Sequence, residues 1–164
     1  MEMISDREHI LLAVIDRLRI IRATDAAWLA GYTDYTYCRK CLRKLCDMGL
    51  LQICRDSAGS NCYYLSGRGL AVLGKQTSHT YEVSATTHHA LVVGRVCAWL
   101  RHTEGASPRE LLTDSVLRSK GDKQRHRPDI VFRGHAYEIE LNHKPLSLLE
   151  KNIRDNSSYQ KQIW

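Results

Sequence analysis

In the first third of the chain, apolar residues recur at the three- and four-residue spacing of helices. The first set consists of Ile10, Leu11, Val14, Ile15 and Leu18. Ser5 and Glu8 have the spacing of a capping box, so we expect a helix that begins after Ser5 and ends near Ile21. A second, short helix is expected over 24–31, with Thr24 as its cap.

Helical spacing continues through a third segment and then changes to short apolar runs. A third helix is expected over 35–48, and two strands over 50–55 and 62–65 around the turn-rich segment 56–61. Three helices followed by a hairpin is the order of a winged helix-turn-helix domain. The segment 41–51 is also similar to the pattern LRKLxxxGLL, with which many winged-helix proteins end the helix and begin the wing.

The third predicted helix has the composition of a DNA-contacting helix. Its candidate DNA-binding residues are Tyr35, Thr36, Tyr37, Arg39, Lys40, Arg43 and Lys44. Cations contact phosphates, and residues at the start of such a helix meet base edges. The alternatives are a solvated helix face or a wing that binds protein. Cys38 and Cys41 have helical spacing, which suits a zinc site poorly, so no zinc is expected.

The second half begins after a polar linker over 76–83. A long helix is predicted over 84–102, on which His88 and His89 are expected to serve packing or capping, and a strand within 108–117. The basic, turn-rich segment 118–127 would attract a phosphate backbone, unless it is only a solvated loop. Its candidate DNA-binding residues are Lys120, Lys123, Arg125 and Arg127. A last amphipathic helix is predicted from Leu146 to Ile163, with Leu148, Leu149, Ile153 and Tyr159 facing inward.

Residues 127–141 predict two short strands joined by a tight turn at Gly134. Asp129 opens the first strand. Glu138 and Glu140 lie two residues apart on the second strand, so we expect them to project to the same side. Three converging carboxylates would repel one another unless a cation or a proton neutralised them, and Mg²⁺ prefers such oxygen ligands. Mg²⁺ is also the usual metal for phosphodiester cleavage.

This order of elements resembles the PD-(D/E)xK nuclease superfamily. The resemblance implies a metal-dependent DNA endonuclease with Mg²⁺ or Mn²⁺ on Asp129 and Glu138. Glu140 stands where the superfamily usually has lysine and would bind the metal or activate water, and Lys144 could supply a displaced lysine. Glu110, on the preceding strand, is a further candidate. The expected fold class is therefore α+β, a winged helix followed by a small α/β nuclease-like domain. Because the chain ends near the second helix, we expect the domain to lack its last strand.

The whole arrangement is similar to the replication-relaxation family and to the MOB-C class of plasmid relaxases. The similarity rests on the winged helix and on the segments 88–93, 107–112, 127–129 and 137–141. It implies a DNA-binding protein that is encoded by a mobile genetic element and that nicks or processes DNA at an origin of transfer or replication. Other mobilization or replication proteins would be its partners. A relaxase would use a tyrosine nucleophile, for which Tyr159 is the only tyrosine on the predicted last helix. The alternative is a non-catalytic regulator or origin-recognition protein with a degenerate nuclease fold.

Composition agrees with a nucleic-acid partner. The chain has 164 residues and a net charge of +6, which favours an anionic ligand such as double-stranded DNA. The six irregularly spaced cysteines, the charged N-terminus without a signal-peptide core and the absence of a long apolar run predict reduced thiols and a cytoplasmic protein. We expect a DNA-binding domain over 1–75, the linker over 76–83 and the nuclease-like domain over 84–164. A homodimer is expected because winged helices often pair on palindromes.

Overall fold

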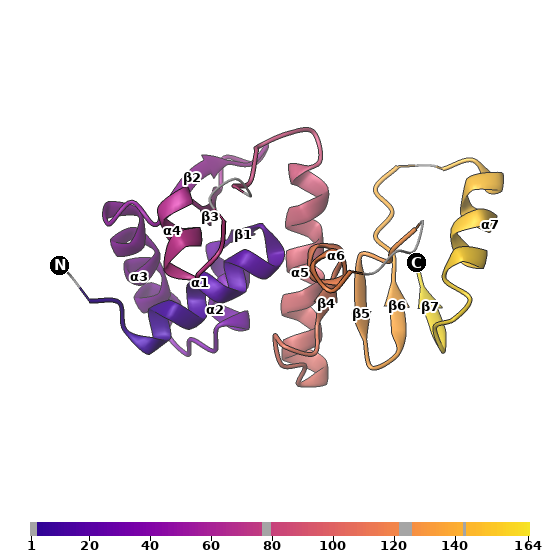
Figure 1. Ribbon diagram of the computed structural model, residues 1–164, viewed down its shortest axis with the longest axis horizontal. Coiled ribbons are helices and arrows are strands. Elements are labelled where there is room, and N and C mark those ends of the chain that lie inside the picture. The colour runs from indigo at the N-terminus through magenta and orange to yellow at the C-terminus, as the bar shows by residue number, and fades with distance from the viewer. Residues whose placement is uncertain (1–2, 77–79, 122–125, 143) are drawn as a thin grey trace.

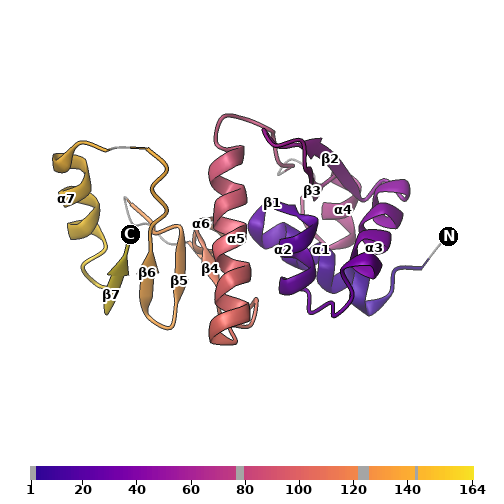
Figure 2. The same ribbon diagram turned by 180° about the vertical axis from the view of Figure 1, so that it is seen from behind.

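The computed structural model describes residues 3–76, 80–121, 126–142 and 144–164. The fold is α+β with two small sheets. Figure 1 shows the elements of the first third gathered at one end, a long helix, α5, across the middle, and the second sheet with α7 at the other end. The same order is visible from behind in Figure 2.

The first part alternates helices and short strands. In chain order its elements are α1 (Asp6–Leu18), β1 (Ile20–Arg22), α2 (Ala23–Leu29), α3 (Tyr35–Asp47), β2 (Leu51–Arg55), β3 (Asn61–Leu65) and α4 (Gly67–Val72). The strands form an antiparallel sheet in the order β1-β3-β2, with Ile20 opposite Tyr64 and Cys54 opposite Cys62. The predicted hairpin is therefore confirmed, and β1 adds a strand that the apolar pattern did not predict.

The predicted capping box at the start of α1 is confirmed. The Ser5 hydroxyl accepts from the Glu8 amide, and the Glu8 carboxylate accepts from the Ser5 amide at 2.8 Å. The helix ends at Leu18 rather than near Ile21, because the following residues pair with β3 instead. The predicted cap of α2 is wrong: that helix begins at Ala23, after Arg22, and has no side-chain cap.

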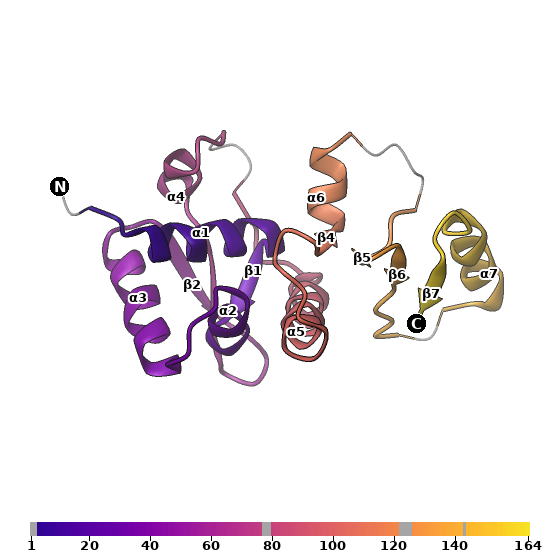
Figure 3. The same cartoon turned by 90° about the horizontal axis from the view of Figure 1, so that it is seen from below.

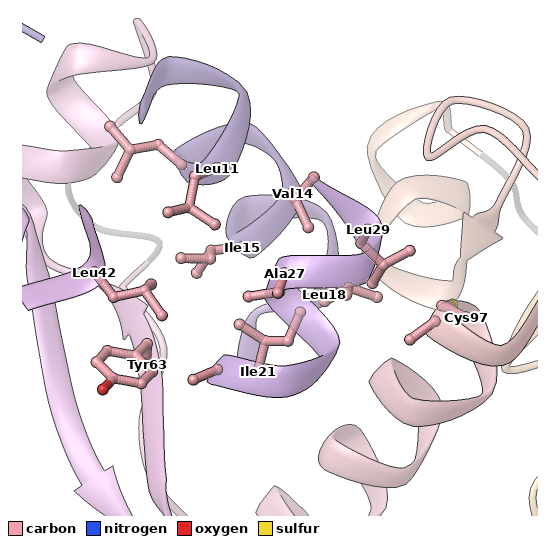
Figure 4. Close-up of a cluster of buried hydrophobic side chains, with 14 of the residues drawn as sticks. Leu11, Val14, Ile15, Leu18, Ile21, Ala27, Leu29, Leu42, Tyr63 and Cys97 are labelled. Carbon is pink, nitrogen blue, oxygen red and sulfur yellow. The ribbon is translucent and has the colours of Figure 1, made fainter. Parts of the chain in front are cut away.

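A continuous apolar core joins the first part to α5 (Thr87–Glu104). Figure 4 shows aliphatic side chains of α1 and α2 facing one another, with Cys97 of α5 near Leu18 and Leu29. The buried cluster continues to Ile130 and Phe132 in the second sheet. The predicted division around 76–83 stays a prediction, and its residues 77–79 lie outside the described part of the chain.

The second part is built on a sheet of very short strands. In chain order its elements are β4 (Leu112–Thr113), α6 (Asp114–Ser119), β5 (Ile130–Phe132), β6 (His135–Tyr137), α7 (Leu146–Asp155) and β7 (Lys161–Ile163). The strand order is β4-β5-β6-β7, and β7 runs parallel to β6. The expectation that the last strand is missing is therefore wrong. The predicted last helix ends at Asp155, and a turn leads into β7.

The faces of α7 also differ from the prediction. Leu148 and Ile153 were expected to face inward, but they are 41% and 42% exposed, whereas Asn152 is buried. Tyr159 lies in the turn after α7 and not on a helix. Within the described residues, no helix combines the length and apolar character needed to cross a membrane.

Candidate nucleic-acid surface and acidic cleft

Helix α3 presents an apolar face to the core and a cationic face to solvent. Asp34 caps the helix by accepting from the Thr36 amide at 2.7 Å. The buried face consists of Cys38, Cys41, Leu42 and Leu45. The first turn exposes Tyr35 and Tyr37, two large aromatic side chains that the core does not use. The amphipathic spacing of this helix therefore explains why its polar face is free to meet a partner.

Three of the four predicted α3 cations gather around one hollow of about 370 Å³. Thr36, Arg39, Lys40 and Arg43 line it from α3, and Ile53, Asn61 and Tyr63 line it from the hairpin. Lys44 has a different role, because its Nζ lies 3.0 Å from Oε1 of the buried Glu8. Lys44 thus ties α3 to the start of α1.

The hairpin that borders this hollow is anchored to β1. In its turn, one Asp56 carboxylate oxygen accepts from the amides of Ala58 and Ser60. The other oxygen lies 2.7 Å from Nε of Arg22. The hydrogen bond from Arg22 and those from the turn amides hold the pKa of Asp56 below its usual range. The turn is therefore fixed by its own side chain, which positions the hairpin beside α3.

In the second part, Asp129 connects three segments at the edge of the short sheet. Its Oδ2 accepts from the Ile139 amide at 2.8 Å and lies 3.3 Å from Nε2 of His89, which stands in the first turn of α5. The same imidazole nitrogen is 3.2 Å from the Ile139 carbonyl oxygen. The hydrogen bond to Asp129 raises the pKa of His89, although burial opposes that shift. Asp129 and His89 therefore form a pair in which His89 holds its proton more tightly than a free imidazole.

Glu138 is the most buried carboxylate of this region, at 7% exposure. Its Oε1 accepts from Nδ2 of Asn156 at 2.6 Å and lies 2.9 Å from Nε2 of His126. Burial raises the pKa of Glu138, and the hydrogen bond with His126 only partly offsets this. The Glu138 amide also donates to the Ile163 carbonyl of β7 at 2.8 Å. The unexpected last strand thus holds the backbone of Glu138 in place.

These two pairs line a single cleft of about 630 Å³, which we call the acidic cleft. Its polar lining consists of Thr86, His88, His89, His126, Asp129, Glu138, Glu140, Asn142 and Lys144. Glu140 and Lys144 form an ion pair at 2.6 Å. The structure therefore brings together four predicted catalytic residues, Asp129, Glu138, Glu140 and Lys144.

The three predicted carboxylates line one cleft, but their side chains have different partners. Strand β6 ends at Tyr137, so Glu138 turns inward to Asn156 while Glu140 is exposed and paired with Lys144. Among the residues that the structure describes, no three His, Cys, Asp or Glu side chains are grouped closely enough to hold a metal ion. Metal binding at Asp129, Glu138 and Glu140 stays a prediction.

The remaining predicted site residues lie elsewhere. Glu110 is in a turn, where it accepts from the Ser107 amide at 2.8 Å, and it does not line the cleft. The predicted strand that would carry it begins only at Leu112. Lys120 follows α6 and is exposed, and Arg127 lies 2.7 Å from Asp114. Lys123 and Arg125 lie outside the described residues.

The two side chains that contact the Glu138 carboxylate were not singled out from the sequence. His126 stands three residues before Asp129, and its place inside a basic segment concealed it. Asn156 caps the end of α7 and is fully buried. A buried amide at the end of a helix gives no periodic signal, so only the fold shows that Asn156 contacts Glu138.

The chain matches no protein-family model and no curated protein.

Proposed function

We propose that this chain is a DNA-binding protein that docks on duplex DNA through α3 and the β2–β3 hairpin, in the manner of a winged helix. One observation carries the proposal: Arg39, Lys40 and Arg43 are exposed together and line one hollow with hydrogen-bonding groups of the hairpin. Guanidinium and ammonium groups bind phosphates, and Thr36 and Asn61 can hydrogen-bond to phosphates or base edges. The net charge of +6 favours the same partner.

A second candidate function, phosphodiester cleavage, is supported by the acidic cleft. Asp129 and Glu138 line it with three histidines and a lysine, and the pKa values of His89 and Glu138 are both raised toward the range useful in acid–base chemistry. In such a reaction Glu138 would take a proton from water. His89 would give a proton to the leaving oxygen, and Lys144 would stabilise negative charge. The second part would then be a nuclease-like domain of the PD-(D/E)xK type.

The biological setting we propose follows from the resemblance to the replication-relaxation family and the MOB-C relaxases. In that setting the chain would act on DNA of a mobile genetic element at an origin of transfer or replication, with other mobilization or replication proteins. A non-catalytic regulator would use the same α3 surface without cleavage.

A nicking assay tests both functions together. Supercoiled DNA is incubated with wild type, Glu138→Ala and Glu138→Gln, with and without Mg²⁺ or Mn²⁺. Glu150→Ala, which removes an exposed carboxylate from α7, is the control. We expect a mobility shift with all four proteins and nicking only with wild type and the control. A shift without nicking in any protein would assign a regulator, and a covalent DNA adduct would assign a tyrosine nucleophile. The absence of a shift would contradict the DNA-binding proposal.

A further inference from the structure

A second hollow opens directly beside the acidic cleft. It has a volume of about 430 Å³ and lies between the end of α1, the first turns of α5 and α6. Figure 3 shows α6 beside the end of α1, at a distance from α3. Four of its lining residues are shared with the acidic cleft: Thr86, His89, His126 and Asp129. The two hollows are therefore continuous.

The lining of this second hollow is dominated by arginine, and we call it the arginine groove. Its charged lining consists of Arg17, Arg19, Arg118, Arg127, Asp114 and Asp129. Four guanidinium groups thus face two carboxylates, before any histidine is counted. Unlike the acidic cleft, the groove has the charge that attracts an anion.

The aspartate between these arginines orients them rather than neutralising the groove. Asp114 accepts from Nε of Arg118 at 2.8 Å through one oxygen and from Nε of Arg127 at 2.7 Å through the other. Arg17 donates to the Leu111 carbonyl at 2.9 Å, an acceptor without net charge. The groove therefore keeps an excess of positive charge while its side chains are held in place.

Arg19 is the residue that indicates a ligand most clearly. Its backbone has φ 70° and ψ −46°, a conformation close to the strained γ-turn with positive φ that glycine adopts more easily. Its side chain is half-exposed, and it forms no hydrogen bond or ion pair within the described parts of the chain. An arginine at a strained position, with its charge available in a groove of like charges, contributes nothing evident to stability.

We propose that the arginine groove binds the phosphate backbone of a single nucleic-acid strand and leads it into the acidic cleft. The planar guanidinium fork matches the oxygens of a phosphodiester. A hollow of this volume has room for part of one strand and is too small to enclose a duplex. This inference rests on the proposed function, because the single strand would come from duplex DNA that is bound at α3.

The test uses fluorescently labelled hexathymidylate, a short single strand that forms no duplex, and measures its binding to the full chain by anisotropy. The variants are Arg19→Gly and Arg19→Gly with Arg118→Ala. Arg154→Ala removes the same charge from the exposed face of α7 and is the control. Arg19→Gly suits the backbone at this position, so a loss of affinity cannot be attributed to misfolding.

We expect Arg19→Gly to weaken hexathymidylate binding about three- to tenfold. The slope of log affinity against log salt concentration should become shallower by about 0.7, as for one lost phosphate contact on a single strand. The double variant should lose more, and Arg154→Ala should stay within about twofold of wild type. Unchanged affinity in both groove variants, or no binding by wild type at all, would overturn the inference.

Arg43→Ala separates this inference from the proposed function. We expect it to weaken the binding of a blunt duplex and to leave hexathymidylate binding unchanged. If Arg43→Ala leaves duplex binding intact while Arg19→Gly still weakens hexathymidylate binding, the groove stands and the proposed docking surface fails. If Arg43→Ala abolishes hexathymidylate binding and Arg19→Gly does not, the groove proposal fails.

Discussion

The two parts of the molecule differ in what they bury. The first part encloses an aliphatic core, with Leu11, Ile15 and Leu42 fully buried. The second part buries polar groups, Glu138 and Asn156 among them, and leaves apolar side chains of α7 on the surface. Buried polar groups must be hydrogen-bonded to be tolerated, and they contribute less stability than an aliphatic core. The first part also buries two carboxylates, Glu8 and Asp25, but these are paired with lysine and arginine and do not line the acidic cleft, whereas Glu138 does.

The parts also differ in how they use charge. On α3, Arg39, Lys40 and Arg43 are exposed, which suits contact with an extended polyanion. In the acidic cleft the charges are paired at short distances, Asp129 with His89 and Glu138 with His126. Charges paired this closely attract a distant ligand less than the exposed cations of α3 do. This difference in charge is consistent with the two proposals, duplex binding at α3 and cleavage in the acidic cleft.

The largest expected effect tests the difference between the two interiors. Leu42→Ala should reduce the free energy of unfolding by about 2–5 kcal/mol, because it opens a cavity in a closed aliphatic core. Leu148→Ala on α7 should change it by no more than about 0.5 kcal/mol, since the side chain is 41% exposed. Equilibrium urea denaturation measures both. Equal losses would mean that α7 is packed as tightly as α3.

A second comparison separates two neighbours on α3. Lys44→Ala should destabilise the protein by about 1–2 kcal/mol, because it removes the cation that holds the buried Glu8. Arg43→Ala should leave stability unchanged but weaken duplex binding about tenfold, a loss of about 1.4 kcal/mol. Denaturation and mobility shift on both variants give the measurements. A result in which both residues affect only binding would contradict the role of Lys44 as a tie between α1 and α3.

The first part could be predicted from the sequence because its elements are long enough to show a period. Ser5 with Glu8 marked the start of α1, and the apolar positions of α3 marked its buried face. The sequence did not predict β1 because three residues are too few to show the alternation of a strand. These residues become a strand by pairing with β3. The pairing of distant segments, and not local preference, makes it a strand.

The site of the second part was predicted only in composition. Asp129, Glu138, Glu140 and Lys144 do meet at one cleft, as the motif indicated. Their orientations could not be predicted, because they depend on β7 and Asn156, which lie 18 or more residues beyond Glu138. The strand period predicted that Glu138 and Glu140 would share a face, but the chain leaves the strand at Tyr137.

Glu138→Gln tests whether the buried carboxylate of Glu138 lowers the stability of the protein. Glutamine keeps an oxygen to accept from Asn156 and removes a buried charge, so stability at pH 7 should stay equal or rise by up to about 1 kcal/mol. The pKa of Glu138 is raised in the folded state. The protonated side chain therefore stabilises the folded protein below its unfolded pKa, and this stability is lost as the pH rises through the folded pKa. In the variant, the free energy of unfolding should fall less steeply as the pH rises. A clear loss of stability at pH 7 would show that the carboxylate is structural.

The smallest effect concerns His89. Its folded pKa is raised by Asp129, so the pair stabilises the fold below the unfolded pKa of histidine, and this contribution is lost as pH rises through the folded pKa. Since the imidazole is 37% exposed, we expect less than about 1 kcal/mol. Unfolding free energies at pH 5.5 and 8.5, compared with His89→Gln, measure the change. An identical pH dependence in the variant would contradict the pair.

The central claim is that α3 and the hairpin bind the phosphate backbone of duplex DNA. The most direct test is the salt dependence of duplex binding by wild type and by the Arg39→Ala/Arg43→Ala double variant. We predict a steep fall in affinity with salt for wild type, and a slope reduced by about 1.8 in the variant, as for two lost phosphate contacts. An unchanged slope, or a wild-type affinity that does not depend on salt, would contradict the account.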